Sequence, residues 1–117
     1  MRCIYESLAL KYRYAIEQLS AVTGRAFTTL HVLGGGTKDR LLCQMTADCC
    51  GLTVKAAPVE ATALGNIMIQ LKALGLLDSI TQGRRLIAET EVIKTYTPST
   101  QNDAEWNAAY DRFKTLL

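Results

Sequence analysis

The chain has 117 residues, of which 49% are hydrophobic and 21% charged, and its formal net charge is +2. This composition is typical of a globular domain and excludes a disordered chain, which combines low hydrophobicity with high net charge. No region is strongly basic, and no apolar run approaches the roughly 18 residues that cross a bilayer. We therefore expect one domain, with neither nucleic acid nor a membrane among its partners.

The N-terminus lacks the layout of a signal peptide, because Lys11, Arg13 and Glu17 interrupt its apolar residues. We therefore expect a cytoplasmic protein whose four cysteines are reduced. On one helix, Cys43 and Cys50 would lie roughly 10 Å apart, beyond the reach of a disulfide. With a single histidine and no CxxC pair, the sequence does not predict a metal site.

Hydrophobic periodicity and chain-breaking glycines predict alternating helices and strands in the first half of the chain. Apolar residues in 2–23 recur every three or four positions, as in a helix with one buried face. That face consists of Ile4, Leu8, Tyr12, Ala15, Leu19 and Val22. A strand over 27–33, a helix over about 39–50 and a strand over 52–57 follow.

In the second half, helical spacing predicts a helix from about Glu60 to Gly75 and a shorter one over 79–89. Residues 91–98 are expected to be extended, and a last helix covers about 103–116. The glycine at position 65, inside a helix, suggests a close approach of another element, because glycine costs about 1 kcal/mol there relative to alanine. The last helix carries an aromatic stripe that is expected to pack: Trp106, Tyr110 and Phe113.

This order of elements predicts an α/β fold. A strand, a helix and a second strand form a right-handed unit with parallel strands. Parallel sheets normally have more strands and are covered on both faces. We therefore expect an incomplete unit, which either belongs to a larger domain or finds its missing strands in another molecule. A homo-oligomer that pairs exposed strand edges is one form of the second alternative.

Three successive glycines, Gly34, Gly35 and Gly36, follow the first strand. Ligands of open α/β sheets bind beyond the carboxyl ends of the strands, and bare backbone there admits a planar base or a phosphate. The next helix would offer its N-terminus to an anion, with Thr37 and Lys38 in the approach. The alternative is a permissive tight turn, with Lys38, Asp39 and Arg40 as a solvated helix end.

The remaining polar residues favour structural roles. We interpret Glu60 as a first-turn charge of its helix, His31 as a structural strand residue, and Arg84 and Arg85 as part of a solvated face. No nucleophile lies at a telling spacing from a base, and no pair of carboxylates stands out. The sequence therefore contains no complete catalytic set.

Residues 30–48, which include the glycine triplet, resemble the adenosine-binding segment of FGGY carbohydrate kinases. Residues 2–9 match the helix that ends the family's second sequence signature. Residues 58–67, 69–71 and 95–98 are most similar to the branch of the family that phosphorylates L-rhamnulose. The resemblance covers essentially all of residues 2–98.

The resemblance implies an actin-like, ribonuclease-H-like fold, in which two domains close over ATP and a ketose. Residues 1–117 would form the far C-terminal part, on the nucleotide side, without a second domain. The catalytic aspartate, the sugar-binding residues and most ligands of Mg would lie in a preceding kinase domain. The implied nucleotide-binding residues are Gly34, Gly35, Gly36, Thr37 and Asp39. Relatives carry asparagine where this chain has Asp39, and an ionised carboxylate can only accept hydrogen bonds.

The reaction implied for the whole kinase converts ATP and L-rhamnulose to ADP and L-rhamnulose 1-phosphate, and we expect the isolated chain to be inactive. An alternative is a non-catalytic interaction or regulatory module derived from a sugar kinase. A dinucleotide-binding protein is disfavoured because the GxGxxG spacing is missing.

Overall fold

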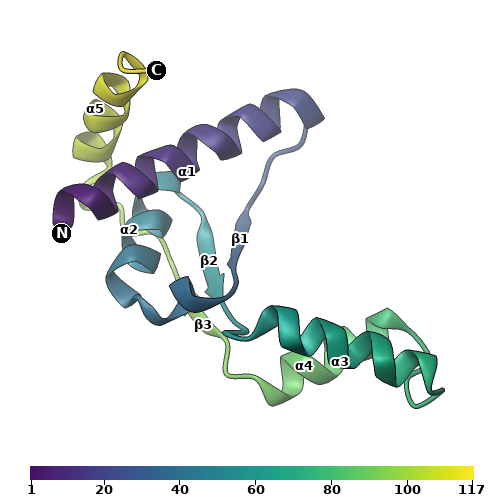
Figure 1. Cartoon of the computed structure of the whole chain (residues 1–117). Coiled ribbons are helices and arrows are strands. Elements are labelled where there is room, and N and C mark those ends of the chain that lie inside the picture. The colour runs from purple at the N-terminus through teal and green to yellow at the C-terminus, as the bar shows by residue number, and fades with distance from the viewer.

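The computed structural model describes all 117 residues as five α-helices, one short 3₁₀ helix and three strands (Figure 1). The helices and strands lie close to the ranges that the sequence predicts. In chain order they are α1 (Arg2–Thr23), β1 (Thr29–Val32), η1 (Gly35–Lys38), α2 (Arg40–Cys50), β2 (Thr53–Ala56), α3 (Ala61–Ala73), α4 (Ile80–Thr90), β3 (Lys94–Tyr96) and α5 (Asp103–Lys114).

Local hydrogen bonds explain where several helices begin and end. The Asp39 carboxylate accepts the backbone N–H of Leu42 at 3.0 Å at the start of α2, and the Ser79 hydroxyl accepts the N–H of Gln82 at 3.1 Å at the start of α4. Gly51 ends α2 in the left-handed conformation. These signals are local in the sequence, which is why the helix bounds are predictable.

The three strands form one mixed sheet in the order β1-β2-β3. The predicted parallel pair is confirmed, with Thr29 opposite Thr53 in the β1–β2 register. β3 pairs with β2 in the antiparallel direction, with Tyr96 opposite Val54. The segment predicted only as extended thus supplies a third strand, and β1 remains at the edge of the sheet.

Helix α2 lies between two small hydrophobic clusters. One cluster joins α1, α2 and α5, and the predicted aromatic stripe of α5 packs there. Its buried members are Ala9, Leu10, Met45, Cys49 and Tyr110. The other cluster packs α2 against the sheet through Cys43, Ala47, Val54 and Ala56. α2 is therefore held from both sides, which fixes the loop that precedes it.

The apolar face that periodicity predicts for α1 is not buried within this chain. Ile4 is 59% exposed and Val22 is 84% exposed, and Leu19 is exposed as well. The buried residues of α1 are instead Ala9 and Leu10, which face α2 and α5. The prediction of a buried face is wrong for this chain because no element of the chain covers that side of the helix.

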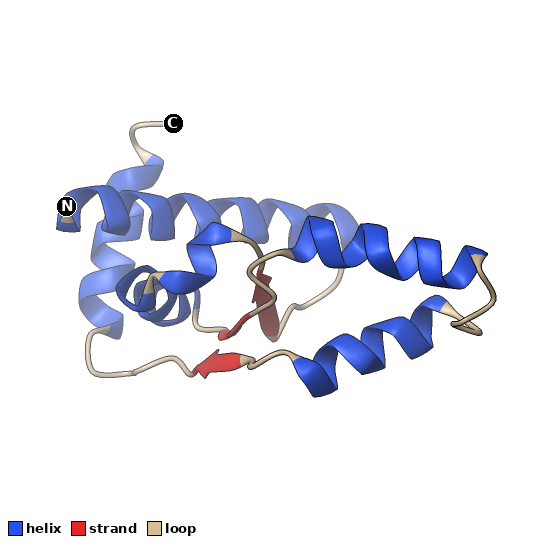
Figure 2. Cartoon of the chain, turned by 60° about the horizontal axis from the view of Figure 1, so that its bottom comes forward, coloured by secondary structure: helices blue, strands red, loops and turns tan.

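Helices α3 and α4 run side by side and project away from the rest of the molecule (Figures 1 and 2). The close approach expected at Gly65 is absent there, because a Cβ at Gly65 would meet no atom within 4 Å. It occurs instead at the buried Gly83 of α4, where a Cβ would collide with the side chain of Met68 on α3. Gly83 is thus the residue that lets the two helices pack.

No helix of the structure combines the length and the apolar composition needed to cross a membrane. The four cysteines are free thiols, of which Cys43 and Cys49 are buried. Burial raises the pKa of the Cys43 thiol, so this side chain stays protonated and packs as a small apolar group.

Candidate functional site

The glycine triplet lies at the carboxyl end of β1, next to the segment that follows β2. Gly34 has φ +82° and ψ −157°, a conformation open essentially to glycine alone. Its N–H donates to the carbonyl of Pro58 at 3.1 Å, and a Cβ on Gly34 would lie 4.0 Å from the carbonyl oxygen of Val59. The two segments therefore meet at one edge of the sheet, where the parallel strands β1 and β2 both end.

The next two glycines leave their backbone open to solvent. Gly35 and Gly36 are exposed, and a Cβ on Gly35 would meet no atom within 4 Å. They are the first two residues of η1, and their N–H groups make no backbone hydrogen bond. Two unpartnered donors on bare backbone are a suitable contact for an anionic group.

The side chain of Thr37 hydrogen-bonds to the backbone of the loop and does not face solvent. It is buried, its hydroxyl donates to the carbonyl of Gly34 at 2.7 Å, and its N–H donates to the same oxygen at 3.1 Å. These two hydrogen bonds close the turn around the triplet. The structure therefore shows Thr37 as the residue that fixes the glycines in place.

Asp39 caps α2 with its carboxylate. One oxygen accepts the N–H of Leu42, and the other accepts the hydroxyl of Tyr5, which reaches over from α1. The Tyr5 hydroxyl and the Leu42 N–H together hold the pKa of Asp39 below its usual range, so the carboxylate is ionised at neutral pH.

This capping changes where an anion could bind. The sequence predicts free N–H groups at the start of α2, but the carboxylate of Asp39 already occupies that position. The free donors lie in η1 instead, at Gly35 and Gly36. Lys38 and Arg40 flank this position, are exposed, and take no part in the three salt bridges of the chain.

A cavity of about 620 Å³ opens beyond the ends of β1 and β2, between α3 and α4. Leu33 and Pro58, which adjoin the triplet and its neighbouring segment, form its inner wall. Gly65 of α3 lines the cavity, and Arg84 and Glu91 supply its charged groups. The cavity is large enough for a purine ring.

Sequence reasoning missed this cavity. Arg84 is exposed, as predicted, and it also lines the cavity. Gly65 was expected to mark a close contact, but it lines the cavity instead. The helical glycine was the available signal, but only the packing of α3 against α4 shows that its missing side chain leaves open space.

The two remaining candidates differ in their relation to the site. His31 is exposed, makes no side-chain hydrogen bond and lines the cavity. Glu60 stands at the N-cap position of α3, where its side chain makes no capping hydrogen bond. No group of three or more histidine, cysteine, aspartate or glutamate side chains could hold a metal ion. The site therefore offers two unpartnered backbone donors and a mostly apolar cavity, whose lining also includes His31, Arg84 and Glu91.

Comparison with known proteins gives a consistent set of relatives. Residues 1–74 match the family model described as the FGGY family of carbohydrate kinases, C-terminal domain. A rhamnulokinase of Bacteroides thetaiotaomicron is 48% identical over 117 residues, which are 100% of this chain and 24% of that protein. A rhamnulokinase of an Enterobacter species is 45% identical over 83% of this chain and 20% of its own length.

A third relative, a rhamnulokinase of Klebsiella pneumoniae, is 41% identical over 87% of this chain and 21% of its own length. The chain thus spans less than a quarter of the length of the curated relatives it matches, and the family model covers more than half of the chain. The chain belongs to the FGGY family of carbohydrate kinases and corresponds to a portion of that family's C-terminal domain.

Proposed function

We propose that this chain forms the nucleotide-binding part of an ATP-dependent sugar kinase. Together with the rest of a rhamnulokinase-like polypeptide, it serves the transfer of the γ-phosphoryl group of Mg-ATP to the 1-hydroxyl of L-rhamnulose. The match to relatives named rhamnulokinase supports the substrate. The observation that carries the nucleotide role is the open glycine backbone at the carboxyl end of a parallel strand.

The nucleotide's phosphates would contact η1. Gly35 and Gly36 offer two exposed N–H groups without backbone partners, and phosphate oxygens accept such hydrogen bonds readily. Any side chain at these positions would stand between the backbone and the ligand. Gly34 and Thr37 hold the loop in this shape through their hydrogen bonds to Pro58 and to each other.

The adenosine would lie towards α3 and α4, in the cavity of about 620 Å³. Its walls are mostly apolar, as expected for a site that binds a planar base. Gly65 keeps one wall open, and Arg84 and Glu91 supply charged groups that could hydrogen-bond the polar edge of a base or a ribose hydroxyl.

Catalysis would require residues beyond those described. Phosphoryl transfer depends on a metal ion that bridges phosphates and on a group that accepts the proton of the sugar hydroxyl. Asp39, the carboxylate that follows η1, is engaged by Tyr5 and Leu42. The role of this chain is therefore to position ATP, while the magnesium ion and the proton acceptor are held elsewhere in the kinase.

Two measurements test the proposal. Calorimetry with ATP on the chain, alone and with the rest of a rhamnulokinase, measures binding, and ADP release in the presence of L-rhamnulose measures activity. We expect the chain alone to bind ATP weakly or not at all and to show no turnover. The assembly should bind ATP and release ADP. Turnover by the purified chain, or an assembly that binds no nucleotide, would contradict the proposal.

A non-catalytic interaction module is the second candidate, and the exposed apolar face of α1 favours it. A module of this kind would form a defined oligomer and bind no nucleotide in any assembly. Light scattering alongside the same calorimetry distinguishes the two functions.

A further inference from the structure

A single hydrogen bond joins α1 to the loop that carries the glycines. The hydroxyl of Tyr5 donates to one carboxylate oxygen of Asp39, while the other oxygen accepts the N–H of Leu42 and caps α2. No other hydrogen bond links α1 to residues 33–39. Two residues that are 34 positions apart in the sequence thus meet directly after η1, next to the proposed phosphate site.

The ring of Tyr5 is held in place by the packing of α1. It is half-buried against the hydrophobic cluster that joins α1, α2 and α5. Ala9 and Leu10, about one turn further along the same helix, are buried in that cluster. The hydroxyl therefore reaches Asp39 from a packed helix, and its side chain loses little conformational freedom when the hydrogen bond forms.

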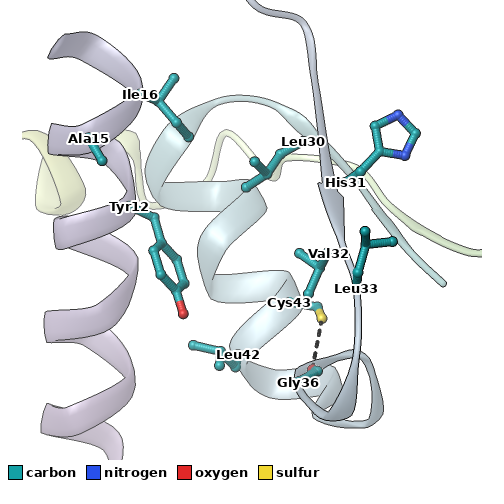
Figure 3. Close-up of a pocket in the computed structure, with 10 residues that line it drawn as sticks. All are labelled: Tyr12, Ala15, Ile16, Leu30, His31, Val32, Leu33, Gly36, Leu42 and Cys43. Carbon is teal, nitrogen blue, oxygen red and sulfur yellow. Dashed lines mark hydrogen bonds between the residues drawn. The ribbon is translucent and has the colours of Figure 1, made fainter. Parts of the chain in front are cut away.

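Asp39 is connected to the glycine triplet through the backbone. Its N–H donates to the carbonyl of Gly36 at 3.2 Å. The thiol of Cys43, in the first turn of α2, points at the same carbonyl oxygen from 3.8 Å (Figure 3). A shift of Asp39 would therefore move the two residues whose N–H groups are free, Gly35 and Gly36.

The carboxylate of Asp39 places a negative charge near a site proposed for phosphate groups, and like charges repel. The hydrogen bond from Tyr5 lowers the pKa of Asp39, which stays ionised, and raises the pKa of Tyr5, which keeps its proton and can donate. Both carboxylate oxygens are thus held by donors, on the side of α1 and α2. Loss of the Tyr5 hydroxyl would leave one oxygen without a donor and its charge uncompensated.

We infer that Tyr5 is a positioning residue of the nucleotide site. Its hydroxyl holds the Asp39 carboxylate against the start of α2, which fixes the loop at Gly35 and Gly36 and compensates the negative charge when a nucleoside diphosphate or triphosphate binds. Tyr5 acts through Asp39 and not by contact with the ligand. This inference rests on the proposed function for the identity of the ligand.

A double-mutant cycle on Tyr5 and Asp39 tests the inference. Calorimetry measures the affinity for ADP and for adenosine of the chain assembled with the rest of a rhamnulokinase. We expect Tyr5→Phe to weaken ADP binding by about fivefold or more, and to change the affinity for adenosine, which carries no phosphate, by less than about twofold. Combined with Asp39→Asn, Tyr5→Phe should change ADP affinity by less than about twofold, because asparagine caps the helix without a charge.

Tyr14→Phe is the matched control. Tyr14 is also half-buried on α1 against the same cluster, but Tyr5 and Tyr110 are the only tyrosines whose hydroxyls make hydrogen bonds. Its removal should leave ADP affinity unchanged. The inference is overturned if Tyr5→Phe leaves ADP affinity unchanged, if it weakens ADP binding equally with and without Asp39→Asn, or if Tyr14→Phe has the same effect.

Hydrogen exchange without nucleotide separates this inference from the proposed function. The amides of Asp39 and Leu42 report on the loop and on the cap of α2. Tyr5→Phe should speed their exchange by about fivefold or more, and Tyr14→Phe should not change it. An assembly that binds no ADP would refute the nucleotide role. In that case, faster exchange in Tyr5→Phe still supports Tyr5 as the residue that positions the loop, and unchanged exchange overturns the inference as well.

Discussion

Replacing Gly35 with valine should weaken nucleotide binding while leaving the fold intact. Gly35 is exposed, its φ lies outside the left-handed region, and a Cβ there meets no atom within 4 Å. A surface substitution of this kind changes the free energy of unfolding by no more than about 0.5 kcal/mol. The melting temperature should therefore move by less than about 3 °C.

The effect on binding follows from the hydrogen bonds that the valine side chain would block. A hydrogen bond to a charged group contributes about 1.5–3 kcal/mol. Loss of one such bond to a phosphate oxygen therefore weakens binding by roughly 10- to 150-fold. The assay is calorimetry with ATP on the complex of the chain with the rest of a rhamnulokinase, accompanied by a thermal melt of each variant.

The contrasting variant is Gly34→Ala. Gly34 has φ +82°, so alanine there strains the backbone by about 1–2 kcal/mol and should lower the melting temperature as well as the affinity. A Gly35→Val complex that melts normally and binds ATP as tightly as the unmodified complex would refute the role given to the open backbone.

Four further predictions concern single residues. Gly65→Ala should raise the free energy of unfolding by up to about 1 kcal/mol, because it removes a glycine from the interior of α3 and the added Cβ meets open space; a thermal melt that shows destabilisation would reveal a contact there. Asp39→Asn keeps the cap of α2 and removes a negative charge beside the proposed phosphate site, so ATP affinity should rise by roughly threefold in calorimetry. The pKa of Asp39 is lowered in the folded state, so its ionised carboxylate stabilises the fold above the unfolded pKa of about 3.9, and this stability is lost as the pH falls through the folded pKa. The free energy of unfolding of Asp39→Asn, measured against pH, should therefore fall less steeply in acid. Burial and the hydrogen bond to Glu17 raise the pKa of Tyr110 to about 12, so its neutral form stabilises the fold below pH 10 and this contribution is lost as pH rises towards 12. Ultraviolet titration should show a tyrosine that ionises at a higher pH than an ordinary tyrosine, and Tyr110→Phe should remove this step. A titration curve that Tyr110→Phe leaves unchanged would place the shift on another tyrosine.

Signals that act over a few residues predicted the helices and the site loop well. Asp39 caps α2, Gly51 ends it, and the two lie within one short stretch of sequence. The parallel pairing of β1 with β2 follows from the handedness of a strand–helix–strand unit. The position of the glycine triplet beside Val59 follows from the same geometry.

Features that depend on distant segments were not predictable in the same way. Tyr96 pairs with Val54 across 42 positions, and nothing local marks that partner. The two helical glycines, Gly65 and Gly83, look alike in sequence, and only the packing of Met68 distinguishes them. Tyr5 was part of a predicted helix, but its hydrogen bond to Asp39 depends on how α1 crosses α2.

The exposed face of α1 shows what periodicity does and does not report. The spacing of Ile4, Leu8 and Leu19 indicates that one face of the helix is apolar. It does not indicate whether the covering element belongs to the same chain. The predicted face is correct as a pattern, while its burial requires a partner that these 117 residues do not supply.

The most direct test of the nucleotide role is hydrogen exchange at the glycine amides of the assembled kinase, with and without ADP. The account predicts that ADP slows exchange at Gly35 and Gly36, whose N–H groups are otherwise unpartnered. Binding of ADP that leaves both amides unchanged and protects a different segment would contradict it.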